Sequence, residues 1–181
     1  TFKKCNSAYA KGGPEQAIKM LNKNLDLTIE KYISVDFAAM TDAVDLLGGI
    51  DIDVDETEID HLNNYIVETS KVTGVASKPL THTGLQTLDG VQATSYCRIR
   101  YTAGDDFKRT ERQREVIQEL VRKAKTMEIS KINDIINAVF PKIATNYSNK
   151  ELLEMAPQMI GYDIADTAGF PFDRETGTIS G

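Results

Sequence analysis

The sequence lacks several features that mark particular classes of protein. It contains no tryptophan and only two cysteines among 181 residues, which excludes a disulfide-stabilised scaffold. No apolar run approaches the roughly 18 residues that a membrane-spanning helix needs, and residues 1–4 open without the apolar core of a signal peptide. With 41% hydrophobic and 27% charged residues, the composition excludes a disordered or collagenous chain and is typical of one globular domain.

The chain also has no excess of positive charge. Its 21 Lys and Arg face 27 Asp and Glu, a net charge of −6, which argues against a general nucleic-acid binder because such proteins hold phosphates with a basic field. The charge is unevenly spread, since residues 98–125 carry nine Lys or Arg against five Asp or Glu, a local balance of +4. This basic segment indicates either a local anion site or a solvated helix with alternating charges.

Motifs for conventional catalysis are missing too. The sequence has no glycine-rich phosphate loop and no nucleophile elbow. His61 and His82 do not have metal-ligand spacing relative to the cysteines. Cys97 lacks the arginine six residues later that a phosphatase-type cysteine needs. We therefore expect Cys97 to be a small buried residue, with no disulfide to Cys5.

The acidic run IDIDVDETEID at residues 50–60 allows two interpretations. Its alternating aliphatic and acidic residues predict an edge or surface strand with one buried face. A calcium loop would need glycine at its sixth position and glutamate at its twelfth, where this sequence has Glu56 and Leu62. The strand is therefore the prediction.

Hydrophobic periodicity and capping residues predict helices and strands that alternate early, with helices dominating later. Asp36, Asp89 and either Asp105 or Asp106 are the expected N-caps. Helices are expected at about 14–25, 37–47, 88–97, 105–127, 131–145 and 149–160, strands at 27–35, 50–60 and 164–172, and mostly loop at 61–86. The pattern predicts an α/β or α+β architecture with helices packed on a sheet. The predicted strands are few for a complete domain of this kind, so we expect the chain to be the later part of a larger domain.

A helical wheel of the long basic helix predicts which of its side chains face the core. With Val116 and Ile117 in the apolar stripe, Arg109 and Gln113 fall on the buried side. Arg112 falls at its margin, whereas Arg114 turns away. An inward arginine in a first helical turn, where free backbone N–H groups already favour negative charge, is the arrangement that an anion site requires.

Arg98 and Arg100 form a second pair of cations. Because only Ile99 separates them, both guanidinium groups would lie on one side of an extended chain. A buried guanidinium needs partners, since leaving it unpaired costs several kcal/mol. Carboxylates and phosphate oxygens are the two alternatives, and the candidate carboxylates are Asp105, Asp106 and Glu111.

Four segments of the chain resemble the LytR-CpsA-Psr (LCP) family, in which an R-x-R motif and an R-x-x-x-Q motif follow one another at the spacing seen here. They are NSAYAKGGPEQAIKMLNKNLDL (6–27), ISVDFAAMTDAVDLLGGIDIDV (33–54), LDGVQATSYCRIRY (88–101) and DDFKRTERQREVIQEL (105–120). The resemblance implies an α/β domain with a central mixed β-sheet flanked by helices, an α-β-α sandwich, of which residues 1–181 are the C-terminal portion.

The same resemblance implies an extracytoplasmic phosphotransferase of the bacterial cell wall. Such an enzyme moves a teichoic-acid or capsule-type glycopolymer from a polyprenyl pyrophosphate carrier to peptidoglycan. In the family, the arginines of the two motifs and the glutamine contact the pyrophosphate. The matching residues of this sequence are Arg98, Arg100, Arg109 and Gln113.

Two further motifs of the family, D-R-S-D-T and P-R-D, do not occur in this sequence. The family uses them to hold Mg²⁺ with an acidic pair, so we expect the metal ligands, the catalytic acidic pair and a membrane anchor to lie on a preceding segment. We also expect the intact protein at the outer face of the membrane of a bacterium with a thick wall, and this chain to be inactive by itself. Two alternatives remain, a non-catalytic polyprenyl-pyrophosphate sensor and a transcriptional regulator or attenuator.

Overall fold

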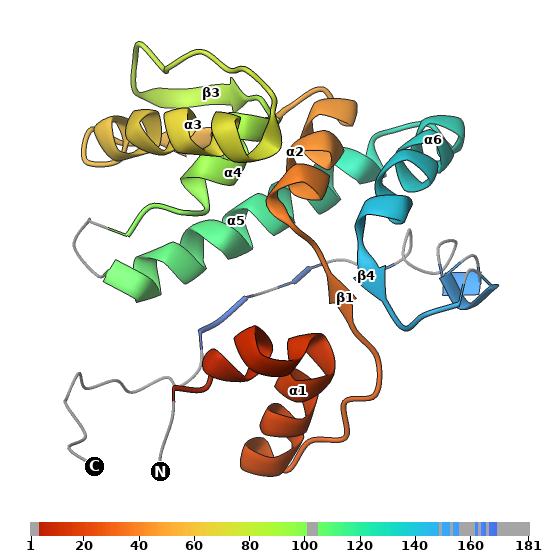
Figure 1. The fold of residues 1–181 in the computed structure, drawn as a ribbon. Helices are drawn as coiled ribbons and strands as arrows, with labels where there is room; N and C mark the ends of the chain where they lie inside the picture. Colours follow the sequence, from red (N-terminus) through yellow and green to blue (C-terminus); the bar gives the residue numbers. More distant parts are fainter. Residues whose placement is uncertain are drawn as a thin grey trace, which may run out of the picture.

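Helices and short strands alternate along the first half of the chain, and helices dominate the second half (Figure 1). A computed structural model describes residues 4–100, 105–148, 150–152, 154–155, 162, 164–165 and 167–169. In chain order the elements are α1 (Ser7–Leu25), β1 (Ile33–Ser34), α2 (Phe37–Leu46), β2 (Ile50–Val54), α3 (Ile59–Thr73), β3 (Gly84–Leu88), α4 (Gly90–Tyr96), α5 (Asp105–Lys125), α6 (Ile129–Val139), the 3-10 turn η1 (Phe140–Lys142) and β4 (Ala144–Thr145).

The strands form two antiparallel pairs. β2 pairs with β3, from Ile50 opposite Leu88 to Val54 opposite Gly84, and β1 pairs with β4 through two residues each. A mixture of helices with small sheets agrees with the expected α/β class. Within the described residues, however, two two-stranded sheets take the place of one central mixed sheet flanked by helices.

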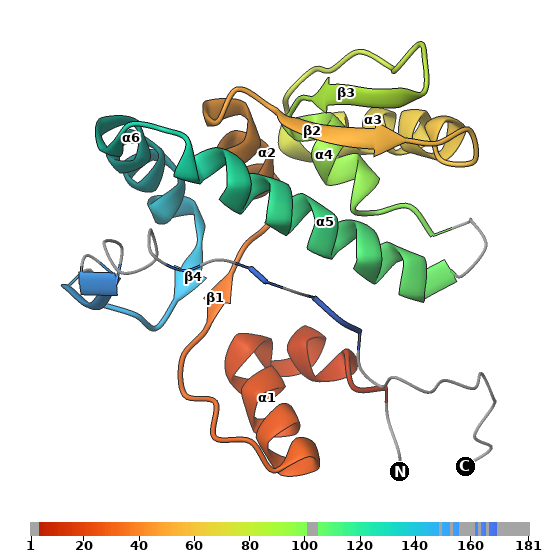
Figure 2. The same cartoon turned by 180° about the vertical axis from the view of Figure 1, so that it is seen from behind.

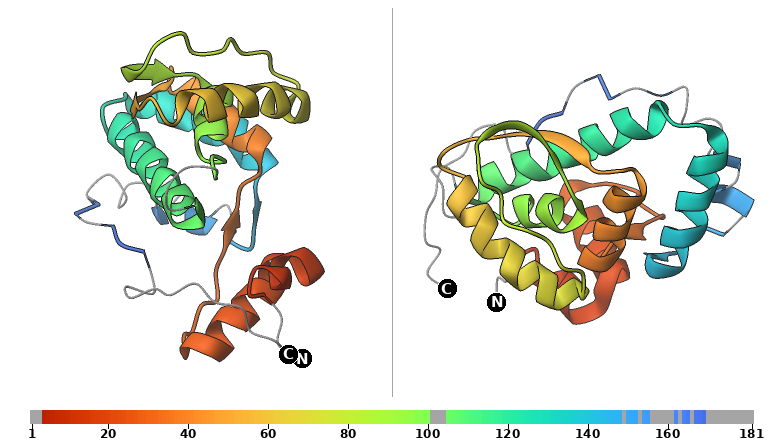
Figure 3. Two further views of the ribbon diagram at one scale, coloured as in Figure 1. Left: turned by 90° about the vertical axis from the view of Figure 1, so that its left-hand side faces the viewer. Right: turned by 90° about the horizontal axis from the view of Figure 1, so that it is seen from above.

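The hydrophobic core lies between β2 and the helices α2 to α5. Ile50, Ile52 and Val54 are almost fully buried, which confirms the apolar face of the predicted strand. The strand expected at 50–60 ends at Val54, however, and α3 begins at Ile59. Figure 2 shows β2 and β3 above α4 and α5, and Figure 3 shows α4 between α3 and α5. Val116 of α5 and Ile99, just after α4, belong to the same buried cluster.

A close approach of two helices fixes the start of α4. A Cβ atom on Gly90 would lie 2.1 Å from the backbone oxygen of Thr41 in α2, so only glycine fits there. The Gly90 N–H donates to Asp45 Oδ1 at 2.7 Å, and burial raises the pKa of this carboxyl despite that bond. The predicted N-cap Asp89 forms a full capping box with Gln92.

Helix α1 stands apart from this core (Figures 1 and 3). It begins at Ser7 rather than near residue 14, contains no buried residue, and kinks at Gly12 and Gly13, where Gly13 has φ of 63°. The strand expected at 27–35 is reduced to Ile33–Ser34, because β4 is also only two residues long and offers no further pairing.

The prediction of mostly loop at residues 61–86 was wrong, since α3 and β3 occupy much of it. α3 buries Leu62, Ile66 and Thr69 at helical spacing, a stripe that its many polar residues obscure in the sequence. α6 ends at Val139, before the Pro141 of η1. Of the helix expected at 149–160, residues 150–152 and 154–155 are helical, and the rest lies outside the described residues.

The strand expected at 164–172 is not seen in the described residues 164–165 and 167–169, and its other positions lie outside them. As predicted, Asp36 is the N-cap of α2 and α5 begins at Asp105. None of the helices in the described part of the chain is long and apolar enough to cross a membrane.

Candidate functional site

The segment that leaves α4 runs along α5 and brings the two arginine motifs together. Gln113 Nε2 donates to the backbone oxygen of Cys97 at 3.3 Å. The preceding residue of the helix, Arg112, donates from Nη1 to the backbone oxygen of Ile99 at 3.2 Å. Two side chains of α5 therefore hold the R-x-R segment, which begins at Arg98, against the R-x-x-x-Q segment.

Asp106 joins the arginines of both motifs. Its Oδ1 lies 2.9 Å from Arg100 Nε and 3.0 Å from Arg109 Nη1, and its Oδ2 accepts from Arg100 Nη2 at 3.1 Å. Arg109 Nε is buried and has no hydrogen-bond partner among the described residues. One carboxylate thus serves two cations, and a buried donor is left for a further acceptor.

Arg98 is held by a different element. Its Nη2 lies 2.9 Å from Glu68 Oε2 and its Nη1 donates to Thr69 Oγ1 at 2.9 Å, both on α3. The guanidinium also lies 4.9 Å from the ring centroid of Phe37 and 5.0 Å from that of Tyr65, so cation–π attraction adds to the ion pair.

The arrangement of the R-x-R motif therefore differs from the prediction. The Arg98 and Ile99 N–H groups continue turn-type bonds to Ser95 and Tyr96, so the chain is not extended at Arg98. As a consequence, Arg98 reaches α3 whereas Arg100 reaches Asp106 on α5.

The wheel prediction for α5 was right for Arg109, which is only 31% exposed, and wrong for Gln113, which is exposed. The buried arginine is Arg112, whose guanidinium Nε lies 2.7 Å from Glu58 Oε1 with side chains 4% and 8% exposed. The buried stripe is centred on Arg112 and Val116 instead, and Ile117 is 52% exposed. The only signal in the sequence for a carboxylate partner of Arg112 was the acidic run at 50–60, which contains Glu58.

The expected carboxylate partners behave differently from one another. Asp106 pairs with both site arginines. Glu111 contacts Lys108 at 3.0 Å, and the side chain of Asp105 lies outside those that the structure describes. Carboxylates therefore satisfy part of the arginine cluster.

Tyr96, whose ring centroid lies 5.9 Å from the Arg112 guanidinium, forms a second polar pair with Glu115. Tyr96 donates from its hydroxyl to Glu115 Oε2 at 2.8 Å, and burial raises the pKa of this carboxyl above its ordinary range. Burial also raises the pKa of the Cys97 thiol to about 12. A thiol with that pKa is protonated at neutral pH and is a poor nucleophile. Cys97 is half-buried rather than fully buried as predicted.

The described residues do not supply an evident metal site. They contain no group of three or more His, Cys, Asp and Glu side chains placed to hold a metal ion. Cys5 and Cys97 are both free, as expected.

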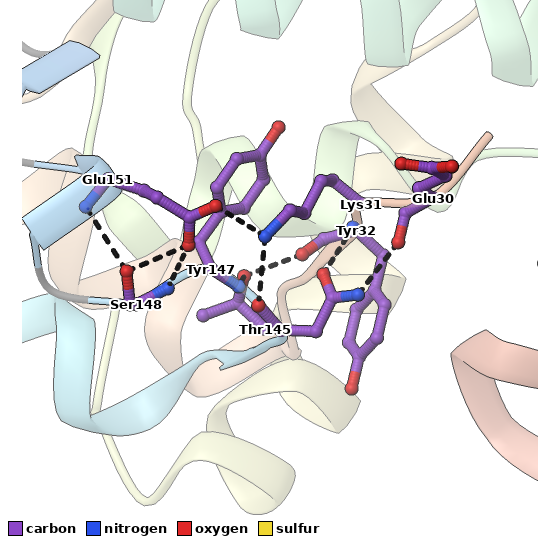
Figure 4. Close-up of polar contacts among 8 residues, drawn as sticks. Glu30, Lys31, Tyr32, Thr145, Tyr147, Ser148 and Glu151 are labelled. Carbon is purple, nitrogen blue, oxygen red and sulfur yellow. Dashed lines mark hydrogen bonds and ion pairs between the residues drawn. The ribbon is translucent and has the colours of Figure 1, made fainter.

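A separate polar cluster joins the segment before β1 to the segment after β4 (Figure 4). Asn146 accepts from the Tyr32 N–H at 3.0 Å and donates to the backbone oxygen of Glu30 at 2.7 Å. Thr145 Oγ1 donates to the backbone oxygen of Tyr32 at 2.6 Å. These bonds connect chain segments more than a hundred residues apart where the two-stranded sheet is short.

Lys31 and Glu151 form the charged part of this cluster (Figure 4). Lys31 Nζ lies 2.5 Å from Glu151 Oε1 and 5.1 Å from the centroid of the Tyr147 ring. The bond from Lys31, together with bonds from Ser148, lowers the pKa of Glu151 to about 2. This cluster has the properties of a structural clamp.

Comparisons with known proteins relate nearly the whole chain to one family. The sequence model of the LytR_cpsA_psr family matches residues 1–172. Biofilm regulatory protein A of Streptococcus mutans is 34% identical over 90% of this chain and 38% of its own length. The polyisoprenyl-teichoic acid–peptidoglycan teichoic acid transferase TagV of Bacillus subtilis is 30% identical over 88% of this chain and 39% of its own length.

Solved structures show the same relationship. The structure of TagT bound to LIIa-WTA superposes with a TM-score of 0.65 at 27% identity, over 87% of this chain and 56% of that one. The likeness confirms the α/β class of the fold. The chain spans less than half the length of the two curated relatives.

Proposed function

Because the chain belongs to the LytR-CpsA-Psr family, we propose that it is part of a cell-wall glycopolymer phosphotransferase. The substrate class is a teichoic-acid or capsule-type polymer on a polyprenyl pyrophosphate carrier, and the acceptor is peptidoglycan. The proposal is supported by the transferase relative TagV and by the likeness to TagT bound to LIIa-WTA.

The observation that carries the proposal is the meeting of Arg100 and Arg109 on Asp106, with Arg109 Nε buried and unpartnered among the described residues. Two guanidinium groups that share one acceptor form a binding site for an anion with several oxygens, because each guanidinium offers N–H donors in a planar fork. We assign the pyrophosphate to Arg98, Arg100, Arg109 and Gln113.

In the proposed reaction, a muramic acid hydroxyl attacks the phosphorus that carries the glycopolymer. The new P–O bond replaces the bond to the bridging oxygen of the pyrophosphate, polyprenyl phosphate leaves with that oxygen, and the proton of the attacking hydroxyl ends on the leaving phosphate. Negative charge increases on the leaving phosphate and on the equatorial oxygens of the transferred group. We propose that Arg100 and Arg109 stabilise this charge, because cations that are already held in position need little reorganisation during the reaction.

We propose that the full-length protein binds Mg²⁺, as the family resemblance implies. The described residues do not fit a metal site, and Asp106 is engaged by two arginines, so no step of the mechanism is assigned to a metal held by this chain. We likewise propose that the full-length protein is anchored in the membrane and works at its extracytoplasmic face.

A sensor that binds polyprenyl pyrophosphate without turnover is the second candidate. The name of the relative from Streptococcus mutans, Biofilm regulatory protein A, favours a regulatory role. DNA binding is disfavoured because the chain is acidic and its motif arginines contact carboxylates. The test is a transfer assay with full-length protein, lipid-linked polymer and peptidoglycan. Tight lipid binding without polymer transfer would identify the sensor, and neither binding nor transfer would overturn both candidates.

A further inference from the structure

The Arg98 side chain contacts two residues of α3, Thr69 and Glu68, which differ in their exposure to solvent. Thr69 is fully buried, and its Oγ1 accepts both from Arg98 Nη1 and from Ser95 Oγ, each at 2.9 Å. Glu68, which contacts Nη2, is 60% exposed. The bond to Thr69 therefore belongs to the packed interior, whereas the contact with Glu68 faces solvent and can be exchanged.

The aromatic rings make such an exchange possible without losing the position of the guanidinium. Phe37 and Tyr65 come from α2 and α3, and both ring centroids lie within 5.0 Å of the Arg98 guanidinium. Contacts to ring faces restrain the guanidinium but leave its N–H edge available for acceptors. Arg98 thus keeps its place when one acceptor at that edge replaces another.

The strength of the contact with Glu68 is also suited to replacement. An ion pair with an exposed carboxylate is worth little, because water and salt screen it. A pyrophosphate carries more charge and more oxygens than one carboxylate, so it competes well for the same N–H groups. Glu68 cannot remain in place beside the incoming anion without electrostatic repulsion.

We propose that Glu68 is a displaceable counter-ion of the pyrophosphate site. In the ligand-free protein Glu68 pairs with Arg98 Nη2. An oxygen of the pyrophosphate replaces Glu68 when the substrate binds, and the ion pair forms again when the product leaves. Glu68 is thus a positioning residue that lowers affinity and favours release. This inference rests on the proposed function, because it takes Arg98 to be a ligand of the pyrophosphate.

The test compares binding of geranyl pyrophosphate to full-length protein by isothermal titration calorimetry. Glu68→Gln removes the charge of the competitor and keeps its shape, so binding should tighten by about two- to fivefold, the value of an exposed ion pair. Asp60→Asn is the matched control, because Asp60 is an exposed acid on the same helix. It should change the affinity by less than about 1.5-fold, since salt screens distant charges.

A double-mutant cycle with Arg98→Met shows whether the effect passes through Arg98. The gain from Glu68→Gln should disappear in the Arg98→Met background, measured at correspondingly higher ligand concentration. An equal gain in both backgrounds would mean a general charge effect and would overturn the proposal. Weaker or unchanged binding of the single variant Glu68→Gln would overturn it too.

The wild-type titration separates this proposal from the proposed function. If the wild-type protein binds geranyl pyrophosphate and Glu68→Gln does not bind it more tightly, only the counter-ion role fails. If the wild-type protein does not bind it at all, the pyrophosphate site itself is wrong, and the role of Glu68 falls with it.

Discussion

Arg100 lies in the segment that follows α4 and Arg109 lies in α5, yet both contact the same oxygen of Asp106, at 2.9 and 3.0 Å. Asp106 is 55% exposed, so the shared carboxylate lies where a solvent-borne anion has access to both cations. In the absence of ligand, the carboxylate reduces the repulsion between two like charges. The two cations of the proposed site are therefore already held together before an anion binds, which lowers the cost of ordering them on binding.

We expect Arg109→Ala to weaken binding of a polyprenyl pyrophosphate by about 1.5 to 3 kcal/mol, the value of a hydrogen bond to a charged group. Calorimetric titration of the full-length protein with geranyl pyrophosphate measures this change. Arg114→Ala is the control, because it removes the same charge from the same helix at a position outside the site. Equal affinities of wild type and Arg109→Ala would remove the central assignment.

Capping residues and strand alternation were reliable guides to the local structure. Asp36 and Asp89 accept from the backbone N–H groups of Ala39 and Gln92, because a short acidic side chain satisfies free donors wherever a helix begins. The alternation in residues 50–54 likewise gave β2 and its buried face. These signals are local, so the sequence contains all that is needed to interpret them.

The orientation of α5 could not be predicted in the same way, because it depends on what the helix packs against. Placing Ile117 in the buried stripe shifted the wheel, although Ile117 is 52% exposed. The shift moved Arg112 to the margin, whereas its ion pair with Glu58 is buried. A charged residue becomes a core residue only through a partner from another element, and the partner lies 54 positions earlier.

The Arg112–Glu58 pair gives a prediction about stability. Arg112→Met leaves the buried Glu58 carboxylate without its cation, and we expect the free energy of unfolding to fall by about 3 to 5 kcal/mol. Urea denaturation of the full-length protein measures it. The double variant Glu58→Leu/Arg112→Met should recover much of this loss, because no unpaired charge stays buried.

Arg122→Met is the control for this measurement. Arg122 is 55% exposed and contacts Glu119 and Asp51, so its loss should change the free energy of unfolding far less than the loss of Arg112. A similar effect of both single variants would show that the Arg112–Glu58 pair is not a special part of the core.

The Lys31–Glu151 clamp predicts a dependence on pH. The pKa of Glu151 is lowered from 4.5 to about 2 in the folded protein, first by the bond from Lys31. A carboxyl whose pKa is lowered on folding contributes stability above its unfolded pKa, and that contribution is lost as pH falls from about 4.5 towards 2. An NMR titration of the side-chain carboxyl should give a midpoint near 2.

Lys31→Met should move this midpoint upward, towards the ordinary glutamate value. Lys19→Met, which removes an exposed lysine from α1, should leave it unchanged. If Glu151 in the wild-type protein titrates like an ordinary glutamate, the clamp is not formed in solution.

The chain of 181 residues by itself should bind the pyrophosphate weakly and transfer no polymer. It contains the four assigned pyrophosphate ligands, but its described residues offer no group of side chains for a metal ion. The arginines alone hold the ground state, and binding that is equally strong in the ground state and the transition state does not accelerate a reaction. The decisive assay compares this purified chain, its mass verified, with the full-length protein, using lipid-linked polymer and peptidoglycan. Transfer by the full-length protein alone is the expected result, whereas comparable transfer by both would place the complete catalytic machinery within these 181 residues.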